Sequence, residues 1–258
     1  MIPQIIHYTW FSGDPFPEKI QRCIDSWHKL MPDYEFVLWD SQRIREIHSV
    51  WLDECLEQKK WAFAADMVRL YAVYHYGGIY LDTDCYIYQS FDTFLNNKSF
   101  IGKENSLHID SGFMEAHLSS HCFGAEAGDY FVGRCLSFYD NRHFNLSDDT
   151  TMPYQLRHGV TMLPYIQSEF AKQHGYNPFP SANYEQHLDC GVTVYPSTYF
   201  DVTKVTKNSY CKHLAVGGWR EVRPEEERIT LGYKIKWRIE AVFKWLANSC
   251  GYLLIKKM

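Results

Sequence analysis

Hydrophobic and polar positions in the first part of the chain switch between strand-like and helix-like patterns. Residues 2–11 form an apolar, β-branched and aromatic run that stops at a turn cluster, which predicts a buried strand. After Pro17 the apolar residues recur at helical spacing until Pro32, and residues 34–39 form a second strand-like run. The chain is therefore expected to begin with a β-α-β unit.

Residues 43–76 are helical in pattern and lead into a short aliphatic segment. The helical pattern stops at a glycine pair, residues 77–78. Residues 79–81 lack polar alternation, as expected of a central parallel strand buried on both faces, and they are followed by Asp82 and Asp84. In open α/β sheets, ligands bind at the carboxyl ends of the strands. The pattern thus predicts a D-x-D motif at a ligand-binding edge.

The second part of the chain is expected to continue the same α/β domain. The pattern indicates strands at residues 100–103 and 122–126, a helix at 130–141 and a helical stretch within 154–170. Linkers, internal repeats and low-complexity tracts are absent from the sequence. We therefore expect one domain over residues 1–233, followed by a segment of different composition.

Composition limits the classes of protein to consider. The 258 residues are 46% apolar and 17% aromatic, which supports a packed core, and the net charge of −5 argues against nucleic-acid binding as the main task. The eight cysteines form no C-x-x-C pair, so reduced thiols are expected rather than a zinc ribbon or a disulfide framework. Neither a signal peptide nor a membrane-spanning run is recognisable, so a cytoplasmic protein is expected.

Two pairs of charged residues are the first candidates for chemistry. Asp82 and Asp84, leaving a buried strand, can converge on one Mn²⁺ or Mg²⁺ ion, although a solvated turn is the simpler alternative. Asp66 and Arg69 lie three apart on one helix face, which alanines keep thin. In a functional interpretation Asp66 accepts a hydrogen bond from a ribose hydroxyl or base edge and Arg69 faces phosphate or sugar oxygens; the alternative is a structural ion pair.

Several motifs within residues 2–91 occur in the order found in one enzyme family. They are IIHYTWF (5–11), CIDSW (23–27), PDYE (32–35), WD (39–40), AADMVRL (64–70) and GGIYLDTD (77–84). This set resembles glycosyltransferase family 32. The family includes bacterial capsule and O-antigen transferases, fungal mannosyltransferases and, more distantly, clostridial glucosylating toxins.

The resemblance implies a fold and an activity. The fold would be GT-A, a Rossmann-like α/β fold with a mixed central sheet flanked by helices, its donor-binding half at about 1–103 and its acceptor and lid half at about 104–233. The activity would be metal-dependent, retaining transfer of a hexose from a nucleoside-diphosphate sugar to a glycan. We favour a UDP-sugar donor over GDP-mannose, and a lipid-linked oligosaccharide of capsule or O-antigen synthesis as the acceptor.

The resemblance also assigns roles to individual residues. Trp10 matches the aromatic that stacks on the base, and Thr9 offers backbone groups to the base edge. Asp82 matches a carboxylate shared between ribose and sugar. The implied donor-binding residues are Thr9, Trp10, Asp66, Arg69, Asp82 and Trp219; the implied catalytic residues are Arg69, Asp82 and Asp84; and the implied metal ligands are Asp84 and His213.

The C-terminal family pattern, roughly His-His-Trp-x-x-Ser-Trp, is only partly kept. Residues 213–219 read HLAVGGW, so His213 and Trp219 match, whereas the second histidine, the first tryptophan and the serine do not. His213 is expected to contact the metal or diphosphate. Trp219 is expected to close over the donor or, alternatively, to pack in the core.

Two other classes of protein remain open from the sequence. Haloacid-dehalogenase-type phosphatases also place D-x-D after a strand, with the first Asp as nucleophile, and the pair Asp148 and Asp149 could mimic their distal acidic residues. Tyr86 stands where that motif usually has Thr or Val. A non-catalytic sugar-nucleotide-binding protein is the third alternative.

Residues 234–258 form the segment of different composition. Six basic residues oppose one glutamate, and apolar residues recur at helical spacing. This pattern predicts an amphipathic helix lying on the anionic inner leaflet of a membrane, where a lipid-linked acceptor would be met. A C-terminal helix packed on the domain, with solvated lysines, is the alternative.

Overall fold

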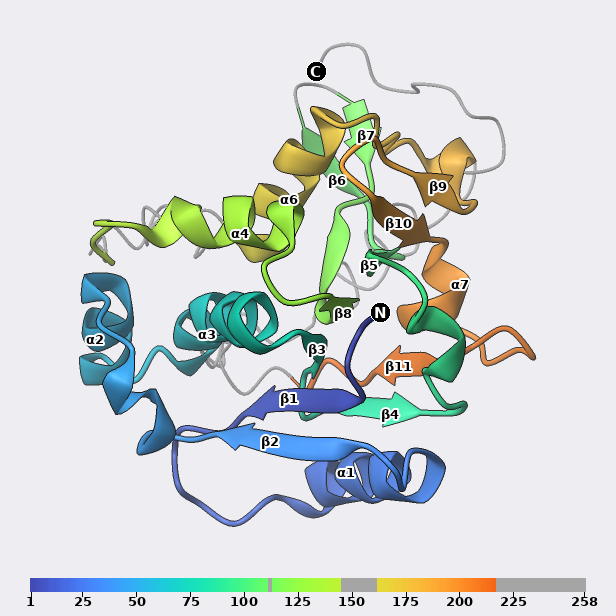
Figure 1. The fold of residues 1–258 in the computed structure, drawn as a ribbon. Coiled ribbons are helices and arrows are strands. Elements are labelled where there is room, and N and C mark those ends of the chain that lie inside the picture. The colour runs from blue at the N-terminus through green and yellow to red at the C-terminus, as the bar shows by residue number, and fades with distance from the viewer. Residues whose placement is uncertain (111–112, 145–161, 217–258) are drawn as a thin grey trace, which may run out of the picture.

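The computed structural model describes residues 1–110, 113–144 and 162–216, which build one central sheet with helices around it (Figure 1). The seven strands lie in the order β2-β1-β3-β8-β5-β10-β9. Their bounds are Glu35–Trp39 for β2, Ile5–Thr9 for β1, Gly78–Leu81 for β3, Leu118–Ala125 for β8, Ser99–Lys103 for β5, Val192–Tyr195 for β10 and Gln186–His187 for β9. Two small ribbons join β4 (Cys85–Ile87) to β11 (Cys211–His213) and β6 (His108–Asp110) to β7 (Phe113–Glu115).

The sheet is mixed, as the family resemblance implied. β1 pairs in parallel with β2 and β3, and β10 pairs in parallel with β5. β8 lies antiparallel between β3 and β5, and β9 is antiparallel to β10. The expectation that β3 is a fully parallel strand is therefore wrong on one side. The chain reaches β8 from β5 through the β6–β7 ribbon rather than through a crossover helix, so it returns in the opposite direction.

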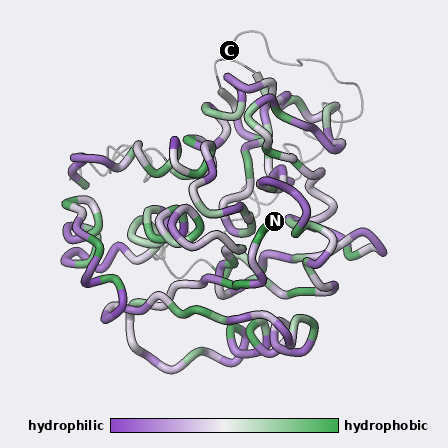
Figure 2. The backbone as a smooth tube through the Cα atoms, in the orientation of Figure 1, coloured by the Kyte–Doolittle hydropathy of each residue, from purple (hydrophilic) through white to green (hydrophobic). Residues whose placement is uncertain are grey.

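The helices cover both faces of the sheet. They are α1 (Glu18–Leu30), α2 (Val50–Glu57), α3 (Trp61–Tyr76), α4 (Tyr130–Leu136), α6 (Leu163–Lys172) and the short α7 (Ser197–Phe200), with 3₁₀ turns η1 (Arg43–Glu46), η2 (Asp92–Phe94), η3 (Ser137–Tyr139) and η4 (Pro180–Ala182). Hydropathy alternates along α1 in Figure 2, and Ile20, Ile24 and Trp27 form its buried side.

Buried apolar residues form two clusters, one on each side of the central strands. The cluster under α2, α3, α4 and α6 includes Tyr80, whereas the cluster under α1 and η2 includes Ile79 and Leu81. Successive residues of β3 thus enter opposite clusters, and all of them are buried. The prediction that this strand is buried on both faces is confirmed.

Most of the early elements follow the sequence pattern, and later ones depart from it. The β-α-β start is present with ends shifted by a few residues, but the helical stretch 43–76 is divided into η1, α2 and α3. The helix expected at 130–141 ends at Leu136 and continues as η3, and α6 occupies the described part of the second helical stretch. The sequence pattern missed β4, β6, β7, β9, β10 and β11 because strands of two to four residues are too short to reveal a period of two.

Other expectations concern cysteines, membranes and the C-terminal segment. The seven cysteines within the described ranges are free thiols. Among the residues that the structure describes, none of the helices combines the length and apolar character needed to cross a bilayer. Asp148, Asp149, Trp219 and residues 234–258 lie outside the described ranges.

Candidate functional site

The D-x-D motif lies directly after β3, where β1 also ends. The parallel register pairs His7 with Tyr80, so Thr9 and Asp82 follow at the same edge. A glycine turn connects α3 to β3, and Gly78 there has a φ of +102°. A Cβ at Gly78 would stand 2.7 Å from the carbonyl oxygen of Ile5. Only glycine fits this turn, which brings α3 back beside β1 and aligns its polar residues with the strand end.

Asp66 and Arg69 share one face of α3, as their spacing predicts, and Asp82 joins them. The guanidinium Nη2 of Arg69 lies 3.3 Å from Oδ1 of Asp66 and 3.3 Å from Oδ1 of Asp82. Nη1 donates to the carbonyl oxygen of Ser120 at 2.8 Å, and Nε donates to the carbonyl oxygen of Ala65 at 3.1 Å. The Arg69 side chain is only 5% exposed. Its donors are directed at protein partners, and its contact with phosphate or sugar oxygens stays a prediction.

Burial and charge act against each other in this network. Burial raises the pKa of Asp66 to about 6, although the nearby Arg69 charge lowers it. Burial also opposes the charge of Arg69, but the carboxylates of Asp82 and Asp66 raise its pKa above the usual value. Arg69 therefore stays protonated, and it holds two carboxylates in place at the end of β3.

Tyr80 is a site residue that sequence reasoning missed. Its hydroxyl donates to Oδ1 of Asp82 at 2.9 Å and lies 3.0 Å from Oγ1 of Thr9. The guanidinium carbon of Arg69 lies 4.6 Å from the centre of the Tyr80 ring. The sequence pattern treated Tyr80 only as a buried strand residue. A lone hydroxyl in an otherwise aliphatic strand, two residues before a carboxylate, was the available signal.

Asp84 and His213 meet although they are far apart in the sequence. β11 pairs antiparallel with β4 and places His213 opposite Cys85, the residue after Asp84. Nε2 of His213 lies 3.1 Å from Oδ1 of Asp84, and the amide of Val216 donates to Oδ2 at 2.9 Å. Burial opposes ionisation of Asp84, but the hydrogen bond and charge of His213 hold its pKa below the usual range. Burial also disfavours a charged His213, yet Asp84 raises its pKa.

Asp82, Asp84 and His213 together form a candidate cation site. Each offers one ligand atom, and these atoms lie within 4.8 Å of one another. Two carboxylates and one imidazole suit Mn²⁺, and carboxylate oxygens also suit Mg²⁺. The side chains of Asp82 and His213 are 24% and 27% exposed, so a ligand can approach from solvent.

The remaining predicted donor contacts lie at the end of β1. Trp10 is partly exposed; its indole Nε1 donates to the carbonyl oxygen of Asp14 at 2.7 Å, and its ring meets Phe16 edge-on at 5.0 Å. Thr9 is paired with Trp39 of β2. The contacts of Trp10 and Thr9 with a base stay predictions.

Comparisons with known proteins agree with these motifs. Residues 17–101 match the model of the family described as glycosyltransferase sugar-binding region containing DXD motif. Inositol phosphoceramide mannosyltransferase 3 of Schizosaccharomyces pombe is 34% identical over 127 residues, covering 45% of this chain and 34% of that protein. Mannosyl phosphorylinositol ceramide synthase SUR1 of Saccharomyces cerevisiae is 31% identical over 121 residues, covering 44% and 31%.

A solved structure described as PaToxG Glycosyltransferase aligns with a TM-score of 0.48 and 16% identity, over 67% of this chain and 69% of that one. The chain spans about a third of the length of the two fungal relatives. The matched segment includes Asp66, Arg69, Asp82 and Asp84. This segment of the chain is therefore similar to the DXD glycosyltransferase family.

Proposed function

We propose that this protein is a DXD glycosyltransferase, which transfers a hexose from a nucleoside-diphosphate sugar to a hydroxyl group of a glycan or glycolipid with a divalent cation. The observation that carries the proposal is the grouping of Asp82, Asp84 and His213 at the strand edge, beside the Asp66–Arg69 pair. A phosphate-rich donor needs a cation and fixed hydrogen-bond acceptors close together. The grouping offers both.

The chemistry follows from what the transfer demands. The bond between the anomeric carbon and the diphosphate oxygen breaks, a bond from the acceptor oxygen to that carbon forms, and the acceptor proton passes to the departing phosphate. A cation bound to Asp84 and His213 would neutralise the charge that develops on the diphosphate. Asp82, held by Tyr80 and Arg69, would accept hydrogen bonds from ribose and sugar hydroxyls.

Attack from the same face as the leaving group is the stereochemistry we favour. Each acidic residue of the site has a partner: Asp66 and Asp82 pair with Arg69, and Asp84 pairs with His213. A covalent intermediate would need a carboxylate that is free to act as nucleophile. The pairing therefore supports retention through direct, phosphate-assisted attack.

The identity of the sugar is a finer part of the proposal. The names of the two fungal relatives refer to mannose and to an inositol phosphoceramide acceptor. These names favour GDP-mannose over the UDP-hexose that we expect from the sequence, and they are compatible with an acceptor attached to lipid. A role in capsule or O-antigen synthesis stays a prediction.

A panel of nucleotide sugars tests the proposal. UDP-glucose, UDP-galactose and GDP-mannose are each added with and without Mn²⁺, and thermal unfolding and release of nucleoside diphosphate are measured. A true donor at 100 times its Kd should stabilise the fold by about 2.7 kcal/mol, and only with metal. If none of these sugars stabilises the protein, while p-nitrophenyl phosphate is hydrolysed, the phosphatase alternative replaces this one.

Peripheral membrane attachment through residues 234–258 is part of the same proposal. Its support is the basic, amphipathic sequence pattern. Sedimentation with vesicles containing anionic lipid, at low and high salt, compares the full chain with a version ending at Gly232. The full chain alone should sediment, and less so at high salt. Equal behaviour of the two versions would contradict attachment through this segment.

A further inference from the structure

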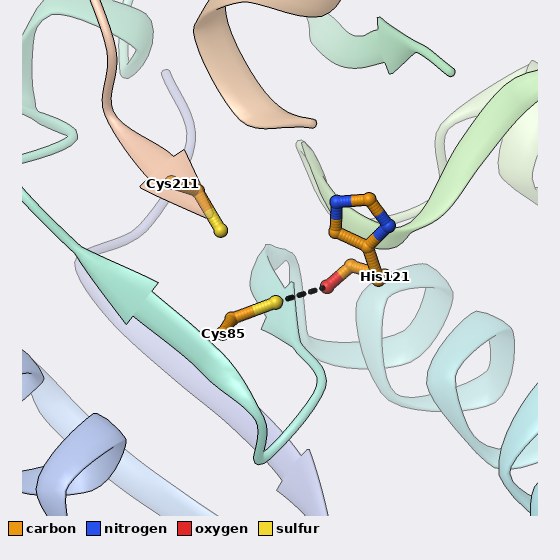
Figure 3. Close-up of side chains that lie close together, drawn as sticks. All are labelled: Cys85, His121 and Cys211. Carbon is orange, nitrogen blue, oxygen red and sulfur yellow. Dashed lines mark hydrogen bonds between the residues drawn. The ribbon is translucent and has the colours of Figure 1, made fainter. Parts of the chain in front are cut away.

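A second cluster of potential ligands lies in the core, next to the D-x-D site but distinct from it in chemistry. It consists of Cys85, His121 and Cys211, whose ligand atoms lie within 4.8 Å of one another (Figure 3). Cys85 begins β4, Cys211 begins β11, and His121 belongs to β8. All three are buried, with exposed fractions of 0%, 5% and 0%.

The register of the β4–β11 ribbon explains why the two thiols face β8 together. Cys85 pairs with His213, so their side chains leave the same face of the ribbon. Cys211 precedes His213 by two residues and therefore shares that face. His121 lies opposite, with its ring stacked on that of His213 at 4.3 Å and 21°.

A third thiol extends the cluster. The Cys122 thiol is fully buried and lies within hydrogen-bonding reach of the Cys211 thiol, which is in turn within reach of Cys85. Two of the seven described cysteines, Cys85 and Cys211, thus lie beside one imidazole, and Cys122 lies next to Cys211. Cysteine thiolates and histidine form the usual ligand set of structural zinc, whereas the carboxylates of the D-x-D site favour harder cations.

We propose that Cys85, Cys211 and His121, with Cys122 as the fourth candidate ligand, bind one Zn²⁺ ion as a structural site. The cysteine thiols would release their protons to solvent on binding. His121 would coordinate through Nε2, which now lies 3.0 Å from the carbonyl oxygen of Phe200, while Nδ1 would donate to the Ser119 hydroxyl, also 3.0 Å away.

The proposed zinc ligands are close in the sequence to the predicted ligands of the D-x-D site. Cys85 is the next residue after Asp84, and Cys211 is two residues before His213. A metal bound by both thiols and by His121 of β8 would link the β4–β11 ribbon, which carries these two predicted ligands, to the central sheet. The zinc would therefore set the positions of Asp84 and His213 without contacting the donor.

The simpler alternative is that these cysteines are small apolar core residues, which is a common role of buried free thiols. In the structure the Cys85 thiol donates to the carbonyl oxygen of His121 at 3.6 Å, a contact that satisfies it without metal. The two alternatives differ in metal content and in spectroscopy, neither of which depends on the proposed transferase activity.

The test uses the full chain, purified under reducing conditions without chelators. We expect about one zinc per chain that survives dialysis, and a cobalt-substituted protein with the near-ultraviolet band of thiolate-to-cobalt charge transfer. Cys211→Ser should abolish that band. Cys55→Ser, which removes an equally buried thiol from α2, should keep it. Asp84→Asn should keep it as well, because the band requires thiolate and not the D-x-D site.

A wild-type protein without retained zinc and without a thiolate–cobalt band would overturn the proposal. So would a band that persists in Cys211→Ser. Because the wild-type spectrum decides by itself, a variant that fails to fold does not leave the question open. A parallel assay of donor binding keeps the two proposals separate, because a wild-type protein that lacks the band but binds the donor contradicts only the zinc site.

Discussion

Two parts of the candidate site solve different physical problems. The Asp66–Arg69 pair is buried, with side chains 9% and 5% exposed, and Arg69 also contacts Asp82. The side chains of Asp82, Asp84 and His213 are more open, at 24%, 13% and 27% exposed. A buried charge network is costly to disrupt and keeps its geometry without ligand. Open side chains can exchange a partner for an incoming cation, so we expect the first part to act as a scaffold and the second to be the place where ligands bind.

The largest effect is expected from removing the arginine at the centre of the buried part. Arg69→Ala leaves Asp66 and Asp82 without their counter-ion, and we expect a loss of about 3–5 kcal/mol in the free energy of unfolding. Arg69→Lys should recover only part of it, because an ammonium group cannot reproduce the planar fork. Urea unfolding measures both variants, and Arg22→Ala on the exposed side of α1 is the control. Equal stability of the Lys variant and the parent would show that the planar guanidinium group of Arg69 is not needed for stability.

A substitution in the open part should reduce activity more than stability. Asp84→Asn is expected to lower metal-dependent donor turnover by about 10²–10³-fold, since charge stabilisation in a transition state is of this order. The melting temperature should change less than in Arg69→Ala, because asparagine keeps the size of the side chain and an oxygen that can accept from the Val216 amide. Release of nucleoside diphosphate and thermal unfolding are measured on the same sample, with the exposed Asp33→Asn as the control. Turnover within tenfold of the parent would remove Asp84 from the metal site.

Trp10 tests how far the open region extends along the end of β1. Trp10→Ala should lose about 1–3 kcal/mol of donor binding, the range for stacking of a base on an aromatic ring. Trp10→Phe should keep most of the affinity. Calorimetric titration with UDP and GDP decides this, and circular dichroism checks that both variants are folded. A folded alanine variant with unchanged affinity would show that Trp10 serves only its contact with Phe16.

The smallest expected effect is a pH dependence that belongs to the buried part. The pKa of Asp66 is raised from 3.8 to about 6 by burial, so the carboxyl is charged above pH 6 and neutral below it. Between pH 3.8 and about 6 the folded protein holds a proton on Asp66 that the unfolded chain has lost. The free energy of unfolding therefore falls as pH rises through this range.

Donor affinity should change with pH in the opposite direction and increase as pH rises. Protonation of Asp66 replaces a charge-assisted hydrogen bond by a neutral one, and we expect about 1 kcal/mol weaker binding below pH 6. Titrations at pH 5.5 and 7.5 compare the parent with Asp66→Asn, which should bind more weakly and lose this component. An unchanged pH difference in the variant would assign it to another group.

Local patterns were sufficient to place Asp66, Arg69 and Asp82. Helical spacing placed Asp66 and Arg69 on one face, and the apolar run before Asp82 indicated a buried strand. These properties depend on neighbours within a few residues. They could be predicted because the geometry of a helix or strand fixes the direction of each side chain from its position in the sequence.

The rest of the site was decided by pairings between distant segments. The antiparallel entry of β8 supplies the Ser120 carbonyl to Arg69, and the β4–β11 register brings His213 to Asp84. The same register gathers Cys85 and Cys211 beside His121, although the sequence shows no closely spaced cysteine motif. By itself, the sequence determined which residues carry charge and which local element presents them. Only the tertiary structure decided which of them meet, because strand register depends on packing summed over the whole sheet rather than on local spacing.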